Sequence, residues 1–266
     1  MKQEEIILKR NLIKNSLGFD SELFVYQDKT MFNYSVDTIM LGNFVSLNRK
    51  VKKMLEIGTN NGALSIFISE RFSELKIDAI EIQSEAIEVA KINVEINNKQ
   101  QQINLINDDF NLFWIKKVKD EHFKKYDSIV CNPPFYRVDK TKISKKISEQ
   151  FLIATHEIKL TLEQLIYGAS KIIEQKGYFT VVIPVERMID CTFLMRKYNF
   201  EPKRIQFILP RMQDQPKLVL IEARYQAGWG TKFLPNLYLH DPNNLTEHLY
   251  RKEIKELYKP KKVITK

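Results

Sequence analysis

Cysteine, glycine and long apolar runs are all scarce in this chain of 266 residues. Its 2 cysteines, Cys131 and Cys191, lie far apart, with no CxxC pattern and no histidine pair nearby. Both thiols are therefore expected to be reduced, buried side chains, and no metal is expected. No apolar stretch approaches the ~20 residues of a membrane span, and the charged start "MKQEEIILKRNLIKN" lacks a signal-peptide core. We expect a cytoplasmic protein without a membrane partner.

Acidic residues are outnumbered, with 42 Lys and Arg against 33 Asp and Glu and a formal net charge of +9. A basic surface attracts nucleic acid through phosphate contacts and the release of counterions. The chain is also rich in lysine, isoleucine and asparagine throughout, a bias that an AT-rich genome produces without any binding function. The charge alone therefore favours a nucleic-acid partner only slightly.

Apolar runs and helical patterns alternate along most of the chain, as in a parallel sheet covered by helices on both faces. Strands are predicted at 51–58, 76–82, 103–107, 127–131, 178–184, 203–210 and 217–225. Helices are predicted at 63–72, 84–98, 160–175 and 185–199. No helix separates the last two strands, which predicts an antiparallel pair closing the sheet. The pattern indicates an α/β, Rossmann-like fold with a seven-stranded mixed sheet.

The two ends of the chain differ from this alternation. Near the start, short strands are predicted at 22–27 and 31–35, and a helix at 37–45. We expect residues 1–49 to form a small extension that packs on the ligand side of the sheet. Residues 50–228 would form the catalytic domain, and residues 229–266 a basic C-terminal tail segment.

The stretch "LEIGTNNGAL" leads from the first strand of the alternation into a helix. Gly58 ends the strand and Gly62 opens the helix, so the loop between them is expected to approach a ligand closely. The dinucleotide pattern GxGxxG is broken by Asn60 and Ala63, which disfavours NAD and other pyrophosphates. Glu56, before the first glycine, suits a ligand that carries a positive charge.

Acidic side chains lie at the ends of the next two strands, at the same edge of the sheet. Glu81 is placed to accept hydrogen bonds from both hydroxyls of a ribose. Asp109 is placed to accept from an adenine amino group, with Ile82 and Phe110 against the faces of the ring. Together with the motif that follows, these features predict S-adenosylmethionine as the cofactor, released as S-adenosylhomocysteine.

The fourth strand runs directly into "NPPF". Two consecutive prolines fix the backbone and cannot donate to a sheet ladder, so the strand must end there. An amino group conjugated to a ring is a poor nucleophile, and two acceptors aimed at its N–H groups would localise its lone pair. We assign these roles to the side-chain oxygen of Asn132 and the carbonyl of Pro133. Pro134 would hold this carbonyl, and Phe135 would stack on the flat target.

In this order, "LEIGTNNG", Glu81, Asp109 and "NPPF" resemble class I S-adenosylmethionine-dependent methyltransferases that act on planar amino nitrogens. Enzymes for N6 of adenine, N2 of guanine and the glutamine amide share the motif, so it indicates the reaction and not the substrate. The flanks "YQDKTMFNYSVDTIMLGNF" and "ATHEIKLTLEQLIYGASKII" resemble the bacterial tRNA1(Val) adenine-N6 methyltransferase family, which modifies adenine 37 beside the anticodon. The likeness covers nearly the whole chain.

This resemblance implies further residues of the site. Asp37 and Thr38 would border the methionine end of the cofactor, and Gln27 and Tyr34 would help to close the site. A basic stretch, "YRVDKTKISKK", follows NPPF, and segments of this length between elements are often lids or binding loops. With tRNA as the partner, the expected RNA contacts are Arg137, Lys140, Lys142, Lys145, Lys146, Lys203, Arg204 and Arg211.

Two positions depart from that family. Asn60 stands where a glycine is frequent, and Thr155 stands where an arginine often precedes His-Glu. The second departure weakens any RNA contact at this position. His156, just before a predicted helix, is expected to be a packing or capping residue rather than a catalyst.

Other functions stay open on the residues alone. A DNA adenine methyltransferase usually needs an extra recognition domain, for which little chain remains, and a glutamine-amide methyltransferase would carry a helical N-terminal domain. A ribosomal RNA guanine-N2 methyltransferase is the main alternative, since one catalytic domain and a basic surface would serve it too. A non-catalytic RNA-binding module predicts erosion of Gly58, Glu81, Asp109 or NPPF, and all of these are intact.

Overall fold

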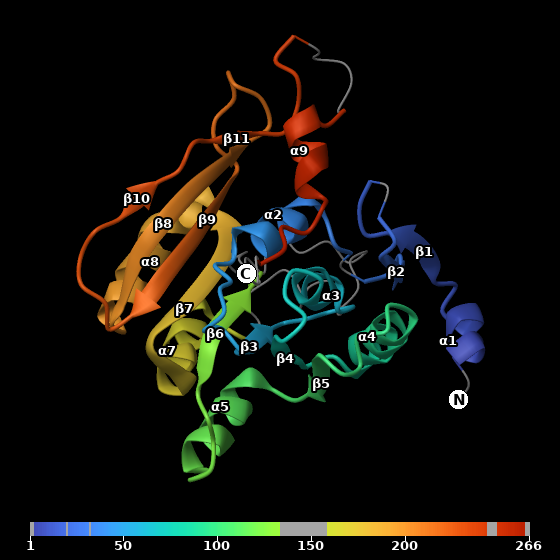
Figure 1. Ribbon diagram of the computed structural model, residues 1–266, viewed down its shortest axis with the longest axis horizontal. Helices are drawn as coiled ribbons and strands as arrows, with labels where there is room; N and C mark the ends of the chain where they lie inside the picture. The colour runs from blue at the N-terminus through green and yellow to red at the C-terminus, as the bar shows by residue number, and fades with distance from the viewer. Residues whose placement is uncertain (1–2, 20, 32, 134–158, 244–248, 264–266) are drawn as a thin grey trace, which may run out of the picture.

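The chain folds around one large sheet, seen in a computed structural model that describes residues 3–19, 21–31, 33–133, 159–243 and 249–263 (Figure 1). Within these residues the sheet has nine strands in the order β10-β8-β9-β7-β6-β3-β4-β5, with β11 pairing β8 outside this path. The sequence predicted seven strands. The two additional ones, β10 (Lys232–Phe233) and β11 (Leu237–Tyr238), are short and lie beside β8.

Neighbouring strands in one part of the sheet run parallel. They are β3 (Lys53–Ile57), β4 (Lys76–Glu81), β5 (Ile103–Asn107), β6 (Tyr126–Cys131) and β7 (Ile173–Pro184). Their carboxyl ends therefore share one edge. On the other side, β9 (Leu218–Tyr225) runs antiparallel to both β7 and β8 (Phe200–Leu209). The predicted antiparallel pair is confirmed.

Successive side chains of each strand enter two separate cores, because helices cover both faces of the sheet. In β3, Met54 joins one core and Leu55 the other. The first face is covered by α2 (Val36–Phe44), α3 (Ala63–Ser69) and α4 (Ser84–Ile96). The second is covered by α5 (Phe110–Lys119), α7 (Leu162–Ile172) and α8 (Met188–Lys197), which follows the short helix η1 (Val185–Arg187). None of the described helices is both long and apolar enough to cross a membrane.

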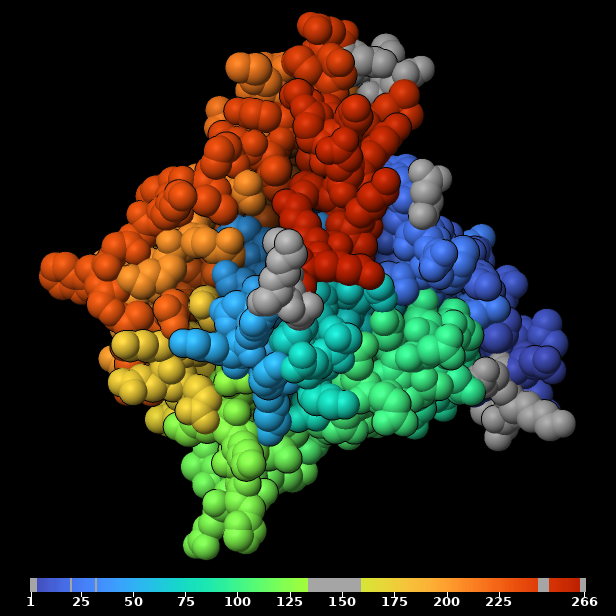
Figure 2. Space-filling model, viewed as in Figure 1, coloured from blue at the N-terminus to red at the C-terminus, as the bar shows by residue number. Residues whose placement is uncertain are grey.

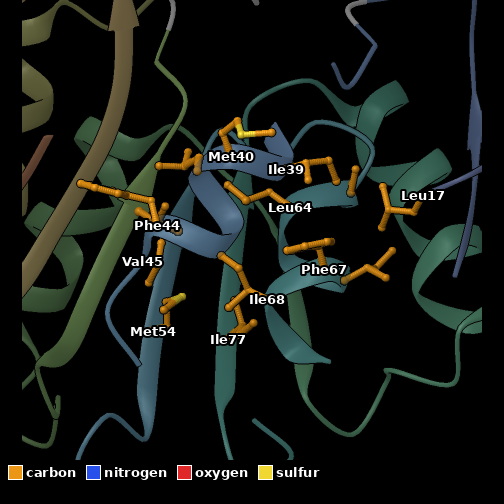
Figure 3. Packing of buried hydrophobic residues seen from close by; sticks show 14 of the residues in the cluster. Leu17, Ile39, Met40, Phe44, Val45, Met54, Leu64, Phe67, Ile68 and Ile77 are labelled. Carbon is orange, nitrogen blue, oxygen red and sulfur yellow. The ribbon is translucent and has the colours of Figure 1, made fainter. Parts of the chain in front are cut away.

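Helices α2 and α3 cross at short range over the first face, where Ile39, Met40 and Leu64 pack together (Figure 3). Gly42 makes the close approach possible, since a Cβ there would lie 2.6 Å from Cδ1 of the fully buried Phe67 ring. The crossing holds α2 in place, so its first turn lies beside the end of β6.

The N-terminal extension contains α1 (Gln3–Lys9) and a two-stranded antiparallel sheet of β1 (Ile13–Ser16) and β2 (Phe24–Gln27). The strand predicted at 31–35 is wrong, since the described residues of this range form no strand. The backbone N–H of Tyr34 instead donates to Oε1 of the Gln27 side chain, at 3.0 Å.

The C-terminal residues fold back onto the rest of the molecule. Figure 2 shows them, in red, between the last strands of the sheet and the N-terminal extension. Helix α9 (Lys252–Leu257) buries Ile254, and beyond it the backbone N–H of Lys261 donates to Oδ1 of Asn43, at 3.0 Å. The N–H of Val263 donates to the carbonyl of Arg71, at 2.8 Å. The described part of this segment is therefore packed against α2 and the residues that follow α3.

Both cysteines are free, buried thiols, as the sequence predicts. Cys131 ends β6 and Cys191 lies in α8, and both belong to the core of the second face. Burial raises the pKa of Cys191 to about 12 and that of Cys131 well above its usual value. Both are consequently apolar packing residues rather than nucleophiles.

Candidate active site

A cavity opens at the carboxyl edge shared by β3, β4, β5 and β6. Most of the residues predicted to be catalytic or to bind the cofactor line it: Tyr34, Thr38, Glu56, Gly58, Asn60, Glu81, Ile82, Asp109, Phe110, Asn132 and Pro133. Three predicted cofactor residues do not. Gln27 accepts a hydrogen bond from the Tyr34 backbone, Gly62 is the N-cap of α3, and Asp37 accepts a hydrogen bond from Asn132.

Several predicted residues lie outside the described part of the chain. They are Pro134, Phe135, Arg137, Lys140, Lys142, Lys145, Lys146, Thr155 and His156. The second half of NPPF and the basic stretch after it therefore stay predictions.

The loop between β3 and α3 turns sharply at one wall of the cavity. Gly58 has φ of 74° and Asn60 has φ of 50°, both in the left-handed region that favours glycine and tolerates asparagine. This explains how Asn60 replaces a glycine without breaking the turn. A Cβ built on Gly58 meets nothing within 4 Å, so the missing side chain leaves free space in the cavity wall.

Glu81 is held by the backbone of two loops. Its Oε2 accepts from the N–H of Asn60 and its Oε1 from the N–H of Gln83, both at 3.0 Å. Burial raises the pKa of this carboxyl, and the hydrogen bonds from the backbone oppose that rise. Each carboxylate oxygen can accept a second hydrogen bond. The fixed geometry therefore suits a pair of neighbouring hydroxyls.

Glu56 lies fully buried beneath the glycine loop. Its Oε2 accepts hydrogen bonds from Oγ1 of Thr59, at 2.7 Å, and from Oγ of Ser65. Burial raises the pKa of Glu56 to about 7 despite these donors, and the neighbouring Glu81 adds to the rise. A positively charged ligand in the cavity would favour the ionised carboxylate. This chemistry matches the role that the sequence predicted for Glu56.

Asp109 and Phe110 start α5. The Asp109 carboxylate caps the helix by accepting from the N–H of Asn111, at 2.7 Å, and can accept further hydrogen bonds from a ligand. Phe110, which is almost fully buried, and Ile82, which is exposed, both line the cavity. These residues offer a polar edge and two apolar surfaces, which suits a flat heterocycle.

The two ends of the Asn132 amide have different surroundings. Its Nδ2 donates to Oδ2 of Asp37, at 3.1 Å. Its Oδ1 is buried and accepts no hydrogen bond from the described residues. A buried acceptor without a partner costs about 1–3 kcal/mol. This oxygen is therefore expected to gain a donor when a ligand enters.

Two further amides of the cavity wall were missed by the sequence reasoning. Nδ2 of Asn61 and Oε1 of Gln83 are buried without a hydrogen-bond partner within the described ranges. Their only sequence signal is proximity to Gly62 and Glu81, and loop amides are too common to single out on that basis. A ligand with both donors and acceptors, such as an amino acid joined to a nucleoside, fits this set. Within the described ranges, no His, Cys, Asp or Glu cluster suited to a metal ion is present.

A family model described as "Methyltransferase small domain" matches residues 36–200, which span β3 to β7 and all of the cavity's strand ends. The chain belongs to this family. It is a methyltransferase, and S-adenosylmethionine is its methyl donor. The predicted family and cofactor are thereby confirmed.

Curated relatives of the methyltransferase share one name, tRNA1(Val) (adenine(37)-N6)-methyltransferase. The relative from Flavobacterium psychrophilum is 30% identical over 181 residues, 68% of this chain and 74% of its own length. The relative from Christiangramia forsetii is 27% identical over 231 residues, 87% of this chain and 91% of its own length.

Solved structures confirm the fold of the methyltransferase. A protein described as a predicted O-methyltransferase from Agrobacterium tumefaciens has a TM-score of 0.65, with 18% identity over 86% of this chain and 98% of the other. The tRNA m1G37 methyltransferase of M. jannaschii has a TM-score of 0.53, with 15% identity over 82% of this chain and 58% of the other. At these identities the likeness concerns the fold alone.

The described basic residues of the methyltransferase that were expected to touch RNA are engaged within the protein. Arg204 pairs through Nε with Oε1 of the buried Glu222, at 2.9 Å. Arg211 is buried, and Nζ of Lys203 donates to the carbonyl of Trp229, at 3.1 Å. The geometry gives no support to phosphate contacts by Arg204 or Arg211, and their role in RNA binding stays a prediction.

Proposed function

We propose that this methyltransferase modifies N6 of adenine 37, next to the anticodon of tRNA1(Val). The shared name of its relatives supports this substrate, as do the flanking sequences that resemble their family. A tRNA substrate also agrees with the expected cytoplasmic location.

The observation that carries the proposal is Oδ1 of Asn132 beside the cavity, which has no hydrogen-bond partner in the described parts of the chain. An exocyclic amino group has two N–H donors. In the proposed complex, one donates to this oxygen and the other to the carbonyl of Pro133, which fixes the amine and localises its lone pair. Asn132 cannot act as a base, so it works by positioning and polarising the amine.

The sulfonium of S-adenosylmethionine supplies the electrophilic methyl group. The amine held by Asn132 and Pro133 would accept this methyl group, leaving S-adenosylhomocysteine, and would release its extra proton to solvent. Within the chain, Glu81 would hold the ribose and Glu56 would favour the positive charge of the donor. Asp109, Ile82 and Phe110 would hold its adenine.

A base stacked in a tRNA loop has to be turned out to reach the cavity, at a lower cost than in a duplex. The proposal assigns Phe135 to stack on this base. It assigns the basic stretch 136–146, here called the flap, to the phosphates of the loop.

The proposal is tested by methyl transfer from labelled S-adenosylmethionine to unmodified tRNAs, ribosomal RNA and a protein extract, followed by nucleoside and amino-acid analysis. N6-methyladenosine in one tRNA is the expected product. N2-methylguanosine in ribosomal RNA, or a methylated glutamine amide, would contradict the proposed substrate while leaving the chemistry of Asn132 in place.

A further inference from the structure

Asp37 stands directly behind the proposed catalytic amide. It lies in the first turn of α2, is only 6% exposed, and does not line the cavity. Its Oδ2 accepts from Nδ2 of Asn132, at 3.1 Å, and its Oδ1 accepts from Oγ of Ser35. The sequence placed Asp37 at the cofactor. The structure shows its carboxylate in contact with Asn132, and Asp37 is not among the residues that line the cavity.

The contact matters because the amide of asparagine is almost symmetric in shape and opposite in chemistry at its two ends. A rotation of the side chain by half a turn would exchange Oδ1 for Nδ2 at the same place. The first offers an acceptor to an incoming amine, and the second offers a donor that repels its N–H groups. An asparagine in a neutral site is free to adopt either orientation.

We propose that Asp37 is a positioning residue that fixes the orientation of the Asn132 amide, so that its oxygen faces the methyl acceptor. This inference rests on the proposed function of the site. An ionised carboxylate only accepts hydrogen bonds, so the end of the amide that faces Asp37 has to be Nδ2. Oδ1 is then left on the opposite side, where it is buried and unpaired within the described chain.

The surroundings of Asp37 favour this role over a purely structural one. No salt bridge joins Asp37 to a cation of the described residues, so its buried carboxylate relies on hydrogen bonds from Ser35, Asn132 and the backbone at the start of α2. Burial raises the pKa of its carboxyl, and the hydrogen bond from Asn132 opposes this rise. An asparagine of the same shape would avoid the cost of a buried charge. However, an asparagine at position 37 both donates and accepts hydrogen bonds, so it would not fix which end of the Asn132 amide faces it.

The direct test is a double-mutant cycle that reverses the polarity of the contact. Asp37→Asn keeps the shape but can accept or donate, so we expect kcat to fall by about 10-fold or more. The Kd of S-adenosylmethionine should stay within about twofold, since Asp37 does not line the cavity. Asn132→Asp places two carboxylates in contact, and we expect a similar or larger loss of kcat.

The double variant Asp37→Asn/Asn132→Asp restores one donor facing one acceptor. The new amide at position 37 can donate to the carboxylate at position 132, whose other oxygen then faces the amine. We expect its kcat to exceed that of either single variant by about 10-fold. A double variant no more active than the weaker single variant would overturn the proposal.

A matched control separates positioning from the structural role of this turn. Ser35→Ala removes the hydrogen bond from the Ser35 hydroxyl to Asp37 but leaves the backbone donors and the contact with Asn132, so kcat is expected to stay within about threefold. The free energy of unfolding is also measured in urea for the wild type, the two single variants and the double variant. Coupling between positions 37 and 132 in the free energy of unfolding without coupling in kcat would show a structural contact only, and would overturn the positioning role.

This test remains valid if the proposed substrate is wrong. If the wild-type enzyme methylates guanine N2 or a glutamine amide, the proposed function is wrong. The cycle is then run on that acceptor with the same expectation, because any planar amine needs the acceptor end of Asn132.

Discussion

At the scale of single residues, the site is a set of polar atoms fixed by the backbone around one cavity. Sequence reasoning selected Glu81, Asp109 and Asn132 because each lies at or just after the end of a strand, and the structure places all three in the wall of one cavity. Sequence reasoning could not find the hydrogen bond between Asp37 and Asn132, whose residues lie 95 positions apart. Such a contact depends on how α2 packs, which no local pattern records.

Asn132 is expected to be indispensable for the chemical step. Asn132→Ala removes the acceptor for the amine, and we expect kcat to fall by roughly 100-fold or more, by analogy with the loss of one oxyanion-type hydrogen bond. Single-turnover methyl transfer measures the chemical step, and equilibrium binding of S-adenosylmethionine serves as the control. Activity retained within a factor of two would exclude the assigned role.

Glu56 should make cofactor binding depend on pH. Its pKa of about 7 in the free protein means that a positively charged donor, which favours the ionised form, displaces a proton. The affinity should therefore increase by up to about 10-fold per pH unit as the pH rises towards this pKa, and level off above it. Calorimetry in buffers of different ionisation enthalpy measures the proton release.

Glu56→Gln is the control for this titration. The amino group of the ligand titrates equally with both proteins, so the difference between the two pH profiles of cofactor affinity reports Glu56.

The stability of the ligand-free protein should depend on pH in the opposite direction, because of the same carboxyl. The folded protein binds a proton between the usual pKa of 4.5 and about 7 that the unfolded chain has released, so its stability falls as pH rises through this window. Identical pH profiles of cofactor affinity for the wild type and Glu56→Gln would contradict the role assigned to Glu56.

At the scale of elements, periodicity predicted the parallel strands and the antiparallel closing pair, because both faces of the sheet are buried and the apolar runs are continuous. Helix α5 was not predicted, since only Phe110 and Phe113 of its residues are buried and its apolar stripe is short. The strand predicted at 31–35 is wrong because alternating apolar and polar residues imitate a strand. The actual partner of Tyr34 there is a side chain, not a neighbouring strand.

Gly42 should be essential to the crossing of α2 and α3. In Gly42→Ala the new Cβ would lie 2.6 Å from the buried Phe67 ring, so either the ring or a helix has to move. We expect overpacking to cost about 1–3 kcal/mol of unfolding free energy, offset by about 0.5–1 kcal/mol from the helix preference of alanine. Urea unfolding measures the net change in the free energy of unfolding.

Gly228→Ala is the matched control, because a Cβ at Gly228 meets nothing within 4 Å. Its unfolding free energy should stay within about 0.5 kcal/mol of the wild type. If Gly42→Ala were as stable as this control, the packing described for α2 would be wrong. Because α2 carries Asp37, a destabilised crossing should also lower kcat.

At the scale of the whole molecule, the formal charge of +9 did not identify a partner, since surface lysines serve solvation as well as binding. The structure narrows the set of candidate RNA contacts, because Arg204 is paired with Glu222 and Arg211 is buried. It also shows a C-terminal segment packed onto α2 and α3, where the sequence predicted a basic tail. The proposed RNA contacts therefore rest mainly on the flap.

Neutralising the flap should weaken RNA binding and leave cofactor binding unchanged. The change is the replacement by glutamine of Lys140, Lys142, Lys145 and Lys146. Fewer phosphate contacts should raise the Kd for tRNA. They should also flatten the logarithmic dependence of affinity on salt, by roughly 0.7–0.9 for each phosphate that is no longer neutralised. Filter binding at several salt concentrations measures both quantities.

Four lysines at the opposite edge of the sheet provide the control. They lie around the amino ends of β3 and β6 and are Lys52, Lys53, Lys124 and Lys125. Replacing them by glutamine removes the same charge far from the cavity, so the affinity for tRNA should change less than in the flap variant. Equal effects of the two variants, or an equal loss of tRNA and cofactor binding in the flap variant, would contradict the flap assignment.

The central claim is that the cavity delivers a methyl group to one adenine amine of tRNA. The most direct measurement is methyl transfer to transcripts of tRNA1(Val) that differ only at position 37, carrying adenine, guanine or purine without an amino group. The account predicts N6-methyladenosine in the adenine transcript and no transfer to the other two. Equal transfer to all three transcripts would show that the methyl group goes elsewhere in the RNA and would contradict the claim.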